Sequence, residues 1–91
     1  MVFVMNKTKL DSIKYYLSIR DILIFMANRN EPTCAKDLTD HVLNTKRHNA
    51  RLIMIHLAEA GLIICKGRIG STYMYVPSIE TIQMYGDLTN D

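Results

Sequence analysis

The fold of this chain is decided by residues 44–76, which read NTKRHNARLIMIHLAEAGLIICKGRIGSTYMYV. Residues 45–60 have the pattern of an amphipathic helix that begins on a polar, basic turn. We expect Thr45 to cap this helix, because its hydroxyl can accept a hydrogen bond from a free N–H of the first turn. Gly61 follows where a helix end favours a left-handed residue. The apolar positions that recur at helical spacing mark the buried face: Ala50, Met54 and Leu57.

Two predicted strands follow this helix, both rich in β-branched and aromatic residues. The first spans residues 62–66 and the second spans residues 72–76. Gly67 and Gly70 lie between them, where glycines favour a turn. The two strands therefore form a hairpin, and we expect the two tyrosines of the second strand to be core or interface residues.

The segments outside this stretch are mainly helical in pattern. Residues 8–28 form an N-terminal helical segment whose apolar face shifts after Ser18, which predicts a break or kink there. Thr33 is expected to cap the next helix, which runs to about Leu43. A last short helix, residues 78–85, follows a Pro-Ser start signal.

The helix-turn-helix segment, residues 33–60, contains AKDLTDHVL and then TKRHNARLIMIHLAEAGLI, and a basic hairpin follows at 62–76. This order resembles the winged helix-turn-helix domain of small bacterial and archaeal DNA-binding regulators, above all at LAEAGLI, residues 57–63. The resemblance implies an α+β fold with about four helices and a β-hairpin wing. Residues near Thr33 are expected to add a short third strand. We expect residues 1–91 to form one domain.

The composition suits one small domain, because 48% of the residues are apolar and can form one core. No apolar run reaches the 18 or more residues of a membrane span. The apolar start of the chain lacks the basic region and long apolar stretch of a signal peptide. Cys34 and Cys65 do not make a disulfide framework of the secreted kind, so we expect reduced thiols. We therefore expect a cytoplasmic or nucleoid-associated protein.

The distribution of charge is more informative than the net charge of +2. The segment from Thr45 to Thr72 holds five Lys and Arg residues and one acid, Glu59, so it carries +4 and the rest of the chain carries −2. Positive charge therefore concentrates on the predicted recognition helix and wing, as expected where a polyanion binds.

The resemblance implies sequence-specific binding to double-stranded DNA, most simply by a transcriptional regulator. The recognition helix, residues 45–60, is expected in the major groove, where its N-terminal residues reach base edges. The wing tip, residues 66–71, is expected on the backbone or in the minor groove. The predicted contacts are Thr45, Lys46, Arg47, His48, Asn49 and Arg51 on the helix, and Lys66, Arg68 and Ser71 on the wing.

Other interpretations remain open from the sequence. The polar helix start and the hairpin tip would also suit solvated surface. A winged helix that binds protein as an adaptor would share this fold, and so would a protein of plasmid or viral DNA maintenance. The chain lacks the nucleotide-binding and hydrolase motifs that would indicate an enzyme. Its histidines and cysteines lack the close spacing of a zinc site, so we expect neither metal nor cofactor.

Apolar residues outside the helix-turn-helix segment predict a homodimer. A two-fold dimer would read two half-sites about 34 Å apart. The alternative is that these residues pack on their own domain. Leu52 and Ile55 lie off the buried face of the recognition helix, and either the first helix or a second subunit should cover them. The predicted dimer contacts are Leu10, Ile13, Leu17, Ile79, Ile82 and Tyr85.

Overall fold

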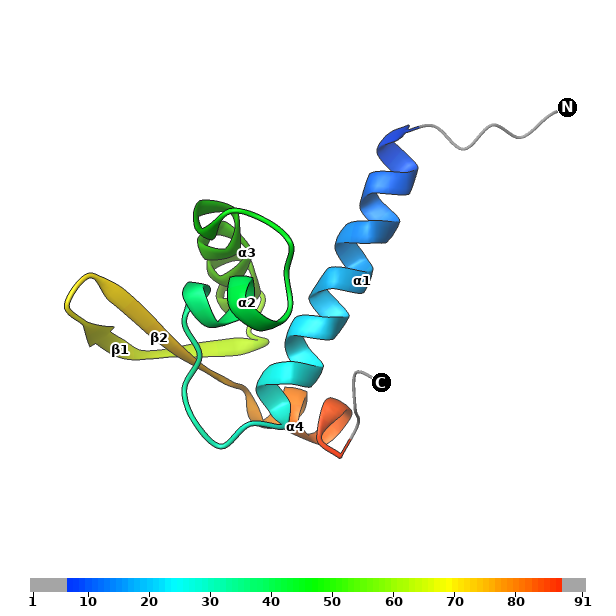
Figure 1. Ribbon diagram of the computed structural model, residues 1–91. Helices are drawn as coiled ribbons and strands as arrows, with labels where there is room; N and C mark the ends of the chain where they lie inside the picture. Colours follow the sequence, from blue (N-terminus) through cyan, green and yellow to red (C-terminus); the bar gives the residue numbers. More distant parts are fainter. Residues whose placement is uncertain (1–6, 88–91) are drawn as a thin grey trace, which may run out of the picture.

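The computed structural model describes residues 7–87, with side chains described for residues 17–87. The described chain forms an α+β domain of four helices and one antiparallel hairpin (Figure 1). This arrangement is consistent with a winged-helix layout. None of its helices is both long enough and apolar enough to span a membrane. The elements in order are α1 (Lys7–Ala27), α2 (Ala35–His41), α3 (Arg47–Glu59), β1 (Ile63–Ile69), β2 (Thr72–Pro77) and α4 (Ile79–Tyr85).

Helix α1 is continuous, so the break or kink expected near Ser18 is wrong. The helix contains neither proline nor glycine, the usual causes of a sharp kink. Extending a helix also costs less than nucleating a second one. The C-terminal half of α1 supplies Ile22, Leu23 and Met26 to the core, while its N-terminal half projects beyond the other helices (Figure 1).

Helix α2 begins one residue later than expected, with Cys34 rather than Thr33 at its N-cap. The Cys34 N–H donates to an Asp37 carboxylate oxygen at 2.9 Å. Thr33 instead forms a single β-bridge with Tyr75 of the hairpin. The expected third strand near Thr33 is therefore reduced to one bridged residue. Helix α2 also ends earlier than expected, at His41.

Helix α3 has the predicted buried face, but Lys46 and not Thr45 occupies its N-cap. The Thr45 hydroxyl instead accepts a hydrogen bond from the side-chain amide of Asn49, in the first turn of α3, at 3.0 Å. At the other end, Gly61 has the predicted positive φ, +80°. Its N–H donates to the Ala58 carbonyl and the Leu62 N–H donates to the Leu57 carbonyl, both at 3.0 Å. This pair is the Schellman arrangement, which satisfies the last carbonyls of the helix.

The hairpin is longer than predicted, because its turn contains only two residues, Gly70 and Ser71. Gly70 has φ +63°, which suits the first central position of a tight hairpin turn. Gly67 lies inside β1 and not in the loop. A β-bulge between Cys65 and Gly67 inserts one extra residue, Lys66, into β1.

Helix α4 starts as predicted at Ser78, whose hydroxyl accepts from the Thr81 N–H at 3.2 Å. The buried Thr81 hydroxyl donates to the Leu62 carbonyl at 2.8 Å, which fixes α4 to the segment after α3. At its other end, the Tyr85 carbonyl accepts from the Asn28 side-chain amide at 3.0 Å. Helix α4 is thus tied to both α1 and the base of the hairpin.

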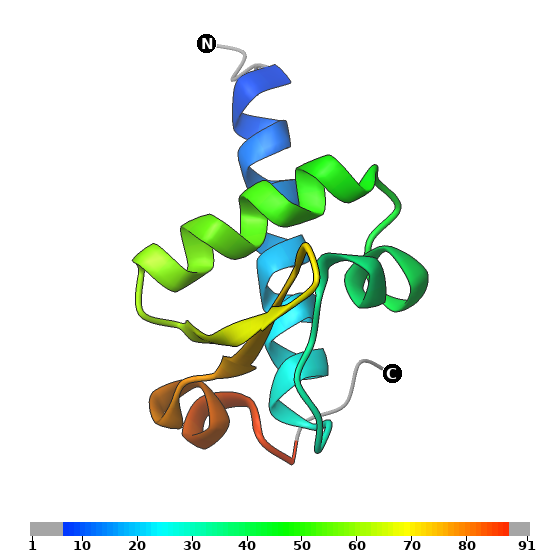
Figure 2. The same cartoon turned by 90° about the vertical axis from the view of Figure 1, so that its left-hand side faces the viewer.

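The core lies where α1, α2, α3 and the base of the hairpin meet. Figure 2 shows α3 lying across α1, with the hairpin beside it. All three predicted positions of the buried face of α3 belong to this core. Its buried members are Ile22, Leu23, Met26, Ala35, Leu38, Ala50, Met54, Leu57, Ile63 and Tyr75.

The packing predicts that Met54→Ala lowers the free energy of unfolding by about 2–5 kcal/mol, because it removes a fully buried side chain and leaves a cavity. Leu52→Ala on the same helix is the matched control. The Leu52 side chain is 42% exposed, so its loss should cost less than about 1 kcal/mol. Urea unfolding followed by circular dichroism measures both values. Equal losses for the two variants would contradict the assigned buried face.

Candidate nucleic-acid interface

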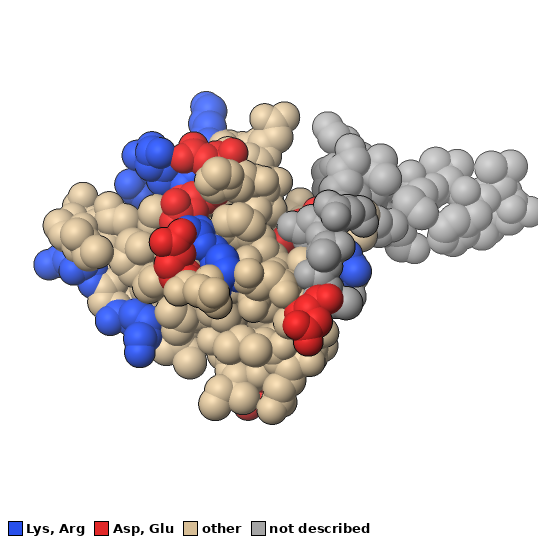
Figure 3. Space-filling view, turned by 60° about the horizontal axis from the view of Figure 1, so that its bottom comes forward, with Lys and Arg blue, Asp and Glu red and all other residues tan. Residues whose placement is uncertain are grey.

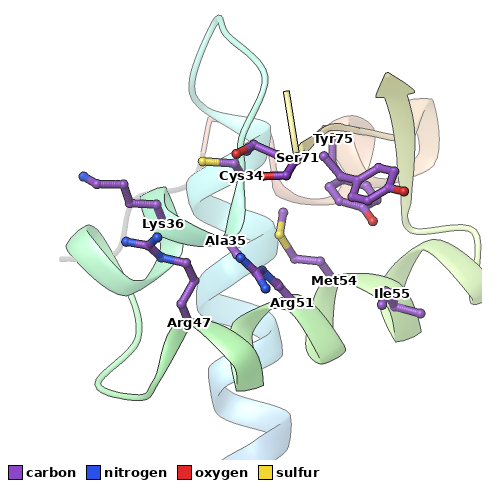
Figure 4. A pocket seen from close by; sticks show the side chains of 11 residues that line it. Cys34, Ala35, Lys36, Arg47, Arg51, Met54, Ile55, Ser71 and Tyr75 are labelled. Atoms are coloured by element: carbon purple, nitrogen blue, oxygen red, sulfur yellow. The ribbon is translucent and has the colours of Figure 1, made fainter. Parts of the chain in front are cut away.

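A hollow lies between the helix-turn-helix segment and the hairpin (Figure 4). Arg47 and Arg51 border it from α3, one helical turn apart. Lys36 borders it from α2, and Ser71 and Tyr73 border it from the hairpin. Two predicted helix contacts and one predicted wing contact are therefore brought around a single space.

The bulge in β1 decides which face of the hairpin Arg68 occupies. Side chains alternate between the two faces of a strand, and directly paired residues share a face. Cys65 pairs with Tyr75 before the bulge, and Arg68 pairs with Tyr73 after it. Without the extra residue, Arg68 would lie on the other face from Cys65. The bulge thus places Arg68 on the face of Tyr73 and Tyr75, which line the hollow.

Arg68 also contacts Tyr73 directly. Its guanidinium carbon lies 5.9 Å from the centre of the Tyr73 ring, within the range of a cation–π contact. Tyr73 is 53% exposed, whereas Tyr75 is buried. Of the two tyrosines expected in the core or in an interface, only Tyr75 therefore lies in the core of this chain. The contact orients the guanidinium without neutralising its charge.

Lys66 is separated from the other predicted wing contacts. It lines a second, shallower hollow with Arg29 and Glu31 from the α1–α2 connection and Ile82 from α4. The structure therefore does not bring Lys66 together with Arg47 and Arg51.

The cations of this region are unpaired. None of the five between Thr45 and Thr72 forms an ion pair with a carboxylate in the part of the chain whose side chains are described. Lys36 differs, because its ammonium binds Asp40 at 2.7 Å, which raises the pKa of Lys36 through that hydrogen bond. In Figure 3, Lys and Arg side chains gather on the side where Figure 1 places the hairpin and α3. Unpaired and exposed cations are available to phosphate groups.

The remaining predicted contacts lie around the exposed start of α3. Thr45, Lys46, His48 and Asn49 are all exposed. Asn49 lies two positions from both Arg47 and Arg51, so it occupies the opposite flank of the helix. The outer face of α3, opposite its buried face, carries one residue per turn: His48, Leu52, Ile55 and Glu59.

Lys36 and Tyr73 line the hollow, and neither was among the predicted contacts. Lys36 lies on α2, where the sequence shows only an ordinary polar helix surface. The sequence does indicate the position of Tyr73. It is two residues from both Ser71 and Tyr75, and residues two apart along a strand lie on the same face.

The histidines and cysteines do not converge on a metal site. Among the described side chains, no group of three or more potential metal ligands lies together. His41 stacks instead on Phe25, with ring centres 5.8 Å apart. Cys34 and Cys65 are both free thiols.

The predicted dimer residues divide into three groups. Leu17, Ile79 and Ile82 are exposed, whereas Tyr85 packs in part against the core of its own domain. Leu10 and Ile13 lie outside the residues with described side chains. Helix α1 does not cover Leu52 and Ile55, which remain 42% and 44% exposed.

Comparison of the chain with models of protein families, with curated proteins and with solved structures found no match.

Proposed function

We propose that this protein is a winged-helix protein that binds double-stranded DNA in a sequence-specific manner and regulates transcription. The observation that carries the proposal is the set of unpaired cations on α3 and β1. Arg47 and Arg51 border the hollow, and Arg68 lies on the hairpin face that carries Tyr73 and Tyr75, which also line it. The start of α3 provides Lys46, Arg47 and Arg51, and β1 provides Arg68.

The dimensions support this proposal. An α-helix with its side chains is about 10–12 Å wide, and the major groove of B-DNA is about 12 Å wide. The first turns of α3 would enter the groove, because they carry the cations, whereas Glu59 in the last turn would repel phosphate. Arg47 and Asn49 are suited to base edges, and Arg68 to the backbone or the minor groove.

A protein-binding adaptor is the second candidate, and the outer face of α3 is the observation that favours it. Leu52 and Ile55 expose aliphatic surface in the middle of this face. Exposed aliphatic residues are more typical of protein contacts than of phosphate contacts. The two candidates differ in their salt dependence, because only DNA binding releases many counterions.

A homodimer belongs to the same proposal. Leu17, Ile79 and Ile82 expose apolar surface outside the helix-turn-helix segment. A symmetric contact through α1 and α4 would bury this surface and leave both copies of α3 free. It would also double the phosphate contacts of each complex.

The affinity for duplex DNA should fall steeply with salt concentration. If each chain neutralises about four phosphates, the log–log slope of the binding constant is near −3.6 per chain. Fluorescence anisotropy with a labelled duplex, over roughly 50–200 mM salt, measures it. A slope near zero would favour the adaptor, and absence of binding at the lowest salt concentration would refute the proposal.

The position of the bulge predicts unequal roles for the two cations of β1. Arg68→Ala should weaken binding to all duplexes about equally and reduce the salt slope by about one. Lys66→Ala changes the charge by the same amount on the same strand, but Lys66 lines the other hollow. It should therefore have the smaller effect in the same anisotropy assay. The reverse order would place the DNA on the α4 side of the hairpin.

The proposed dimer predicts that Ile79→Asp gives a monomer. Ile79 is 69% exposed, and an acidic residue in the first turn of a helix is favourable, so the fold should be retained. Light scattering at micromolar concentration gives the mass, and Gln83→Asp, at another exposed position of α4, is the charge control. A wild-type protein that is monomeric with and without DNA would exclude the dimer.

A further inference from the structure

The hollow beside α3 combines an apolar floor with a cationic rim. Ala35, Met54 and Tyr75 line it from three different elements, but each is more than nine-tenths buried, so its accessible apolar surface comes mainly from Ile55 and Tyr73, which are 44% and 53% exposed. Arg47 and Arg51 stand at its border from α3 (Figure 4).

The size of the hollow limits what it can hold. Its volume is about 220 Å³. An apolar cavity of about 150 Å³ is large enough for benzene, whereas sites for drug-sized ligands begin at about 300 Å³. One ring with one small substituent therefore fits inside it.

The charged side chains around the hollow favour an anionic ligand. No Asp or Glu residue lines it, and neither Arg47 nor Arg51 forms an ion pair with a described carboxylate. A planar guanidinium matches a carboxylate with two parallel hydrogen bonds. The exposed ring of Tyr73 and the side chain of Ile55 are favourable partners for an aromatic ring.

We infer that this hollow is a binding site for a small organic carboxylate with a single ring. The ring packs against Tyr73 and Ile55, above the buried Met54 and Tyr75, and the carboxylate binds Arg47 and Arg51. Because both arginines belong to the proposed DNA contacts, the occupied site competes with DNA. The ligand would thus act as an inducer that releases the protein from its operator, and this second part rests on the proposed function.

Benzoate is the probe for the site in the absence of DNA. A titration followed by the methyl signals of Met54 and Ile55 should give saturable shifts, since both residues line the hollow. Acetate lacks the ring, benzyl alcohol lacks the charge and inorganic phosphate lacks both the ring and the planar carboxylate. All three should bind more weakly than benzoate. Shifts that do not saturate, or acetate or phosphate binding as tightly as benzoate, would overturn the inference.

A pair of charge-matched variants separates the site from general electrostatic attraction. Arg51→Gln should weaken benzoate binding about tenfold or more, because it removes a hydrogen-bonded charge from the ligand. Arg20→Gln removes the same charge from an exposed position on α1 that does not line the hollow, and it should leave benzoate affinity unchanged. Equal weakening by both variants, or no weakening by Arg51→Gln, would overturn the site.

Competition with DNA is measured separately, so that the two proposals fail in different ways. Benzoate should raise the apparent dissociation constant of a duplex more than the same concentration of sodium acetate does, and Arg51→Gln should reduce that difference. If benzoate binds but no duplex does, the ligand site stands and the DNA-binding proposal fails. If a duplex binds equally well with benzoate and with acetate, the inducer role is overturned.

Discussion

Two backbone hydrogen bonds between Thr33 and Tyr75 hold the hairpin in position opposite α3. The Thr33 N–H donates to the Tyr75 carbonyl at 2.8 Å, and the Tyr75 N–H donates to the Thr33 carbonyl at 2.9 Å. Both residues are buried, so neither peptide group could exchange these bonds for water without loss of packing. The floor of the hollow and the distance between the two groups of cations both depend on this pair.

The rest of the hairpin contributes little to its own position. Ile63 is the only buried residue of β1, and Tyr75 is the only buried residue of β2. A two-stranded hairpin alone is marginally stable in water, so the tip is held through its base. The core and the Thr33–Tyr75 pair fix that base, while the bulge at Lys66 sets which face of the tip carries Arg68. In the proposed function, this construction leaves the exposed tip free to meet a polyanion.

Several features set by local sequence were predicted correctly, although the Thr45 cap was not. The buried face of α3, the left-handed Gly61 and the Ser78 cap depend on residues within one or two turns. Features that depend on contacts between residues far apart in the chain were not predicted. Thr33 has the sequence of a helix cap, but pairing with Tyr75, 42 positions away in the chain, takes it out of that role. The bulge depends on strand register, and the position of Lys36 beside Arg47 depends on how α2 packs on α3.

The outer face of α3 shows why charge and exposed apolar surface must be weighed together. Arg47 and Arg51 lie on the flank that faces the hairpin, whereas Leu52 lies on the outermost face and Ile55 lies between that face and the hollow, which it also lines. In a helix that enters the major groove, the outermost residues meet base edges, and apolar side chains there can contact the methyl group of thymine. Of the two flanking arginines, Arg51 would meet phosphates at the groove wall, while Arg47 in the first turn would reach base edges. The aliphatic residues therefore do not exclude DNA. In the proposed complex they leave the centre of the helix without polar hydrogen-bonding groups, so hydrogen-bonded base contacts would come from its first turn, where Arg47 and Asn49 lie.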